Sequence, residues 1–173
     1  MTKLLRAYVR KVGVISEWTG KTVCFLGLAL VFTITVDVFL RYVFNAPTKW
    51  SYDITYMLGG TLLIMPAGYV LYHKGHVAID IVRRTMPRKV GLGMDLVLHL
   101  VFFFPLVIVL VYTSADHAVT SIIQRELSNV GFWRPPLYPF RIMIPVAYFL
   151  LLIQGVATFI QDAYALLDRG EEL

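Results

Sequence analysis

The sequence has little charge and almost no cysteine. Only 16% of its 173 residues are charged, and Cys24 is the single cysteine, whereas soluble domains carry about 25% charged residues. One cysteine excludes an intramolecular disulfide and any metal or redox motif built from several cysteines. The sequence also contains no glycine-rich phosphate loop and no nucleophile next to a partnered base. These absences argue against an enzyme.

The sequence is rich in apolar residues. They make up 58% of the chain, and they come in blocks that reach the length of about 20 residues needed to cross a bilayer as a helix. The sequence therefore predicts an all-α integral membrane protein that forms a single membrane domain over residues 1–173. Its four expected transmembrane helices cover about residues 22–44, 52–72, 90–114 and 139–163.

The distribution of basic residues predicts the orientation of these spans. Residues 1–21 carry five Lys or Arg and a single acid, and the segment 73–89 is also rich in cations. Because cytoplasmic loops carry an excess of Lys and Arg, both segments and both termini are expected on the cytoplasmic side. The net charge of +5 is then a topology signal and does not indicate nucleic-acid binding.

The first 21 residues also show apolar side chains at helical spacing. This pattern predicts a short basic amphipathic helix on the membrane surface. A signal peptide is the alternative, but no small-residue cleavage pattern follows the first apolar run. We therefore expect the segment to be retained.

A short connection joins the first two spans and predicts an antiparallel helical hairpin. Asn45 and Pro47 break the helix. Asp37 and Arg41 lie four residues apart, on one helix face, near the end of the first span. We interpret them as an ion pair that anchors the hairpin or meets a partner subunit, with an ion or proton site as the alternative.

The second span contains three features typical of packed membrane helices. Asp53 lies in its first turn, where a carboxylate favours the positive end of the helix dipole, so helix capping accounts for it. Gly59 and Gly60 are predicted to let a neighbouring backbone approach closely, and Pro66 is predicted to kink the helix. A further kink is expected at Pro105 in the third span.

Several other polar residues could have either a chemical or a structural role. His76 and Asp80 could share a metal on a helix, but too few ligands lie near, so we expect a hydrogen bond that orders the loop. Asp95 and His99 share a face of the third span and are the best proton-relay candidate; a polar contact between helices is the alternative. Gln154 is expected to hydrogen-bond across helices.

Two groups of residues together resemble a known family. The first group surrounds the hairpin and consists of Arg41-Tyr42-Val43-Phe44-Asn45, Pro47, Trp50-Ser51 and Asp53. The second follows the second span and consists of Gly75-His76-Val77, Ile79-Asp80 and Pro87. In order and spacing they resemble the small membrane subunit (DctQ-like) of tripartite ATP-independent periplasmic (TRAP) transporters. Asp53 stands where that family more often has Glu.

The resemblance implies a role in transport across the bacterial inner membrane. In that family a large multi-span subunit carries the substrate and sodium, and a periplasmic protein captures the substrate, typically an organic acid. The small subunit stabilises the large one as a scaffold among the membrane lipids. The resemblance therefore implies no cofactor or metal on this chain. It also implies that a set of residues fixes helix ends and subunit contacts, namely Trp50, Ser51, Asp53, His76 and Asp80.

Two other functions compete with this interpretation. A membrane-anchor subunit of a respiratory enzyme would bind haem or quinone, and two haem-ligating histidines must face each other at similar depth. His99 is expected inside a span, His73 and His76 at the inner boundary and His117 at the outer side, which leaves a strained His73–His99 pair as the alternative. A self-contained carrier needs discontinuous helices and polar groups at mid-membrane. Apart from Gln154, the sequence predicts neither.

Overall fold

The computed structural model describes residues 3–73 and 88–167, and it leaves out the side chains of residues 88 and 89. Four of its helical segments, residues 3–43, 51–72, 90–123 and 138–167, are long and apolar enough to cross a membrane. The predicted class, an all-α membrane protein with four spans, is confirmed. The helices are α1 (Lys3–Val43), α2 (Ser51–Ile64), α3 (Ala67–Tyr72), α5 (Arg88–Leu98), the π-helix η1 (His99–Phe103), α6 (Phe104–Ile123) and α7 (Tyr138–Leu167).

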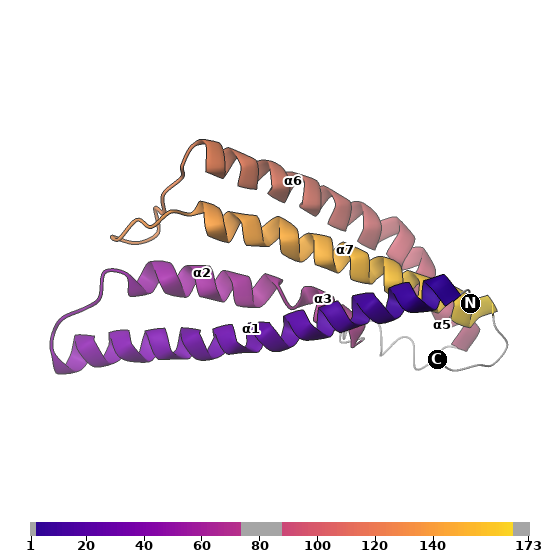
Figure 1. Cartoon of the computed structure of the whole chain (residues 1–173), viewed down its shortest axis with the longest axis horizontal. Coiled ribbons are helices and arrows are strands. Elements are labelled where there is room, and N and C mark those ends of the chain that lie inside the picture. The colour runs from indigo at the N-terminus through magenta and orange to yellow at the C-terminus, as the bar shows by residue number, and fades with distance from the viewer. Residues whose placement is uncertain (1–2, 74–87, 168–173) are drawn as a thin grey trace.

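The helices lie side by side in one broad layer (Figure 1). Near the loops 44–50 and 124–137 the order across the layer is α1, α2, α7 and α6, whereas at the opposite end α1 crosses beside α3 and contacts α7 directly. The helix α7 is the centre of the packing, because it contacts α1, α2, α3, α5 and α6. Figure 1 also separates two ends. We call the end with residues 44–50 and 124–137 the loop end, and the end with the first turns of α1 and the last turns of α7 the basic end.

The helix α1 is continuous, which differs from the two separate helices expected for residues 1–21 and 22–44. Val12, Ser16 and Val23 are buried, so the amphipathic segment packs into the bundle along with the span. The rings of Tyr72 and Tyr69 lie over Gly13 and Gly20, where a larger residue would collide with them. Packing against α3 and α7 thus prolongs the helix. Its position relative to the membrane surface stays a prediction.

The helix breaks predicted for the hairpin are present. The helix α1 ends at Val43, and Asn45 adopts a φ of 53°, a left-handed conformation that asparagine tolerates better than most residues. The backbone N–H of Ala46 donates to the carbonyl of Leu40 at 3.1 Å and closes the helix end. The chain then turns, and α2 begins at Ser51.

Pro66 interrupts the second span as predicted. The helix α2 ends at Ile64 and α3 begins at Ala67, because proline has no N–H to donate and its ring excludes the carbonyl four residues earlier. The expectation for the glycine pair was only partly right. The ring of Phe140 lies 2.6 Å from the position a Cβ would take on Gly60, whereas nothing lies within 4 Å of that position on Gly59. An aromatic ring, not a backbone, approaches Gly60.

The third span contains a π-helix just before Pro105. The backbone N–H of Phe104 donates to the carbonyl of His99, five residues earlier, and this wider turn accommodates the proline. Phe103 projects from the wide turn onto α7, where its ring leaves no room for a side chain on Gly155.

The third span is also longer than predicted. The helix α6 continues to Ile123, beyond the predicted end of the span at residue 114, so residues 115–123 are helical. Asp116 and His117 are exposed, while Ala118 and Ser121 are buried. The span was predicted too short because the polar residues on the exposed face of this helical extension resemble those of a loop.

Candidate functional site

A buried carboxylate ties the two connections at the loop end together. Asp53, in the first turn of α2, is 0% exposed. Its Oδ1 accepts a hydrogen bond from Ser128 Oγ at 2.5 Å and another from the backbone N–H of Gly131 at 3.1 Å. We call these three residues the Asp53 clamp. It joins α2 to the connection between α6 and α7.

The clamp corrects the interpretation of Asp53 as a helix cap. Trp50 occupies the N-cap position of α2, and no side chain caps the helix there. Asp53 binds across the bundle instead. Its Oδ2 is buried and has no hydrogen-bond partner among the described residues, and a Cβ on Gly131 would fall inside the contact distance of the carboxylate. Glycine at position 131 is therefore required for the loop to close over Asp53.

The ion pair predicted between Asp37 and Arg41 is present, and it includes a third member. Arg41 donates to Asp37 Oδ2, and the hydroxyl of Thr48 donates to Oδ1. The backbone N–H of Thr48 donates to the same Oδ1 at 3.1 Å. Because these bonds connect α1 to the turn before α2, Asp37 orders the hairpin from within. A role in contacting a partner subunit stays a prediction.

A second ion pair at the loop end was not foreseen. Arg141, in the first turn of α7, donates to Glu126 Oε1 at 2.7 Å, and each side chain is 30% exposed. The backbone N–H of Leu137 also donates to the carbonyl of Glu126 at 2.9 Å. An irregular loop separates the two residues, so no periodic pattern in the sequence links them.

Gln154 makes the predicted hydrogen bond across helices. Its Oε1 accepts from Ser16 Oγ at 2.8 Å, which links α7 to α1, and its side chain is 2% exposed. Thr158, one turn further along α7, donates its hydroxyl to the carbonyl of Gln154 at 3.1 Å. The side-chain Nε2 of Gln154 donates to Thr158 Oγ1 at 3.5 Å, so both the oxygen and the nitrogen of the amide are bonded within the chain.

Asp95 and His99 are brought together, but through the backbone. His99 Nδ1 lies 2.9 Å from the backbone carbonyl of Asp95. Since a carbonyl only accepts, Nδ1 carries the proton in this bond. The imidazole also packs on Phe103, with ring centroids 5.2 Å apart. This contact suits a residue that shapes the π-helix, and the proton relay stays a prediction.

The remaining predicted site residues lie at the second span and beyond it. Trp50 is half-buried directly before α2, and Ser51 is buried as the first residue of that helix. His76 and Asp80 lie outside the described residues. Among the residues the structure describes, no group of three or more His, Cys, Asp or Glu could hold a metal ion.

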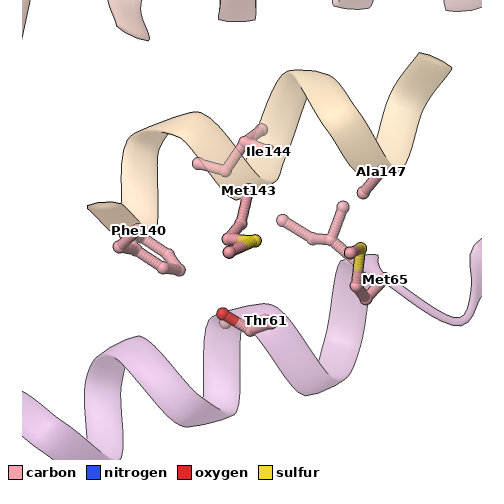
Figure 2. A pocket seen from close by; sticks show the side chains of 8 residues that line it. Thr61, Met65, Phe140, Met143, Ile144 and Ala147 are labelled. Atoms are coloured by element: carbon pink, nitrogen blue, oxygen red, sulfur yellow. The ribbon is translucent and has the colours of Figure 1, made fainter. Parts of the chain in front are cut away.

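The interruption at Pro66 does not open a binding site. The crevice beside it, between α2 and α7 (Figure 2), has no space that a water molecule could enter. Its lining is apolar apart from Thr61, whose hydroxyl donates to its own helix at the carbonyl of Met57, 2.8 Å away. Met65, Phe140 and Ala147 fill the space around it. The crevice is a packing feature.

These observations define a multi-pass α-helical membrane protein in which buried Asp37, Asp53 and Gln154 connect separate segments of the same chain. The family model for tripartite ATP-independent periplasmic transporters, DctQ component, matches residues 22–164. The chain therefore belongs to this family and is a transporter component of the inner membrane. No curated protein and no solved structure gives a significant match.

Proposed function

We propose that this chain is the scaffold subunit that stabilises a large multi-span subunit in the membrane. The complete transporter would be sodium-coupled and would import an organic acid delivered by a periplasmic binding protein. The observation that carries the proposal is the match to the DctQ component over residues 22–164. The sodium and the substrate would bind to the large subunit and not to this chain.

The open helical layer supports a scaffold role. Large apolar side chains on α1 and α6 are exposed, among them Phe25, Phe32, Leu106 and Val109, which are 71%, 71%, 61% and 57% exposed. Such surface must be covered by lipid or by protein in the membrane. A layer that leaves so much of its apolar surface uncovered is well suited to lie against a larger helical partner.

The internal use of polar groups supports the absence of substrate from this chain. A self-contained carrier places polar groups beside interrupted helices near mid-membrane. The helices here are interrupted at Pro66 and in η1, next to the two prolines for which the sequence predicts kinks. However, the crevice at Pro66 is apolar and too narrow for water. Gln154 is bonded within the bundle.

The respiratory-anchor alternative gains no support. The family that matches is a transporter component, and His99 is already engaged with the carbonyl of Asp95. We therefore retain only the transporter interpretation.

Co-purification tests the scaffold role. The tagged chain is co-expressed with the large TRAP subunit, solubilised in mild detergent and analysed by mass spectrometry. We expect the large subunit in one-to-one stoichiometry, and we expect sodium-driven uptake in proteoliposomes only when all three components are present. Uptake of the organic acid by this chain alone, or purification of the chain without the large subunit, would contradict the proposal.

Cysteine cross-linking then identifies the face that meets the large subunit. Cys24 is exposed and is the only cysteine, so Cys24→Ser gives a cysteine-free background. Single cysteines replace Phe32 on α1 or Val109 on α6, both more than half exposed. We expect cross-links to the large subunit from one of these faces. Cross-links from neither, in a complex that still co-purifies, would place the interface elsewhere on the chain.

A further inference from the structure

A groove at the basic end is lined by three cations of α1. Lys3, Arg6 and Arg10 border a cavity of about 620 Å³ between α1, α3 and α7. Their spacing of three and four residues places them on one face of the helix. All three are exposed. We call this cavity the basic groove.

The cations of the basic groove are not neutralised by the described part of the chain. Ion pairs between described residues involve Lys21, Arg41 and Arg141 and none of the three groove cations. The described lining also contains no carboxylate. Three like charges along one helix face repel each other, so an anion in the groove would stabilise this arrangement.

The other groups around the groove suit a phosphate ester with an apolar tail. Tyr72 and Gln161 add a hydroxyl and an amide to its lining, while Ala7 and Val9 add apolar surface. A free inorganic anion would use the charges but not this apolar surface.

We propose that the basic groove binds the headgroup of an anionic phospholipid. The groove lies at the end of the bundle where the chain carries its excess of cations, and basic pockets between membrane helices recognise anionic headgroups on the cytoplasmic side. The phosphate lies between Arg6 and Arg10, and the acyl chains follow the apolar surface of α1. This site does not depend on the proposed scaffold function.

The cavity at the loop end does not have the same character. It is lined by Arg41 and Lys49, but Arg41 is already paired with Asp37. Only Lys49 remains there without an ion pair among the described residues. The basic groove therefore has the stronger unsatisfied charge.

Native mass spectrometry of the full chain in detergent tests the site with dioleoyl phosphatidylglycerol as the probe. The wild type is expected to bind it with higher affinity than dioleoyl phosphatidylcholine, which has no net charge. Each cation near an anionic lipid contributes about fivefold in affinity, so Arg6→Gln with Arg10→Gln should weaken binding of phosphatidylglycerol by about thirtyfold. Arg6→Lys with Arg10→Lys should retain most of it.

The matched control is Lys11→Gln, which removes an exposed cation of the same helix that does not line the groove. We expect less than about a twofold change, because its charge lies outside the site. Helicity and thermal unfolding confirm that each variant is folded, and the single Arg10→Gln, with an expected loss of about fivefold, replaces the double variant if that one unfolds.

Four outcomes would overturn the proposal. An equal loss in Lys11→Gln would mean attraction to net charge alone, and equal binding of phosphatidylcholine would mean that charge is not recognised. Competition by inorganic phosphate at the affinity of the lipid would indicate a site for a free anion. Binding only after deletion of residues 168–173, which include Asp168, Glu171 and Glu172, would show that the acidic tail occupies the groove.

Discussion

The two ends of the bundle differ in which of their charged side chains find a partner among the described residues. At the loop end, Asp37 and Glu126 pair with cations of the same chain, and Asp53 is buried under backbone and hydroxyl donors. At the basic end, Arg6 and Arg10 form no ion pair with described residues. At the loop end, bonds within the chain order the connections between helices. At the basic end, the cations that pair with no described residue are available to a molecule outside the chain.

The largest expected effect of breaking the loop end comes from Asp53→Ala. Two hydrogen bonds to a charged group are lost, and Ser128 remains buried without its acceptor. We expect the free energy of unfolding, measured in mixed detergent micelles, to fall by about 3 kcal/mol. Asp116→Ala, which removes an exposed carboxylate of α6, is the control. Wild-type stability of Asp53→Ala would mean that the clamp does not hold the loop.

The interior contact between α1 and α7 should rank second. Gln154→Leu keeps the approximate volume but leaves the hydroxyl of Ser16 buried without its acceptor, so we expect a loss of about 1–2 kcal/mol. Ser16→Ala in the same background should restore part of the stability, because it removes the unsatisfied hydroxyl. A double-mutant cycle measures this coupling, and strictly additive effects would show that the bond contributes nothing.

The ion pair between Glu126 and Arg141 at the loop end should contribute less to stability, because its carboxylate is more exposed than that of Asp37. Glu126→Gln removes the charge that Arg141 meets, while both side chains retain contact with solvent. We expect a loss of about 0.5–1 kcal/mol, reduced further at high salt. A loss as large as that of Asp53→Ala would mean that the two contacts form one network.

The smallest effect is expected from the pair Glu17 and Lys21 in α1. Their side chains are 41% and 67% exposed. They lie one turn apart on the same helix, between the loop end and the basic end. Lys21→Gln should leave thermal unfolding unchanged within error, because exposed pairs of this kind contribute little. A clear drop in the melting temperature would mean that charge on α1 stabilises the bundle outside the loop end as well.

The class of the protein and the places where its helices break can be predicted from the amino-acid sequence. Apolar length produces four spans because a helix must satisfy its own backbone in lipid. The helix breaks at Asn45 and Pro66 are local: asparagine tolerates a left-handed backbone, and proline removes a backbone hydrogen bond of its own helix. The pair of Asp37 and Arg41 could be predicted for the same reason, since one helical turn fixes its geometry.

The pairing of distant groups follows from the packing of the helices and cannot be predicted from the sequence. Asp53 bonds to Ser128 and Gly131, and Gln154 bonds to Ser16, over separations for which no sequence periodicity exists. The continuation of α1 through its basic segment and the formation of the basic groove likewise depend on packing against α3 and α7. Burial makes these contacts specific, because a polar group removed from solvent must find its partner wherever the fold brings one.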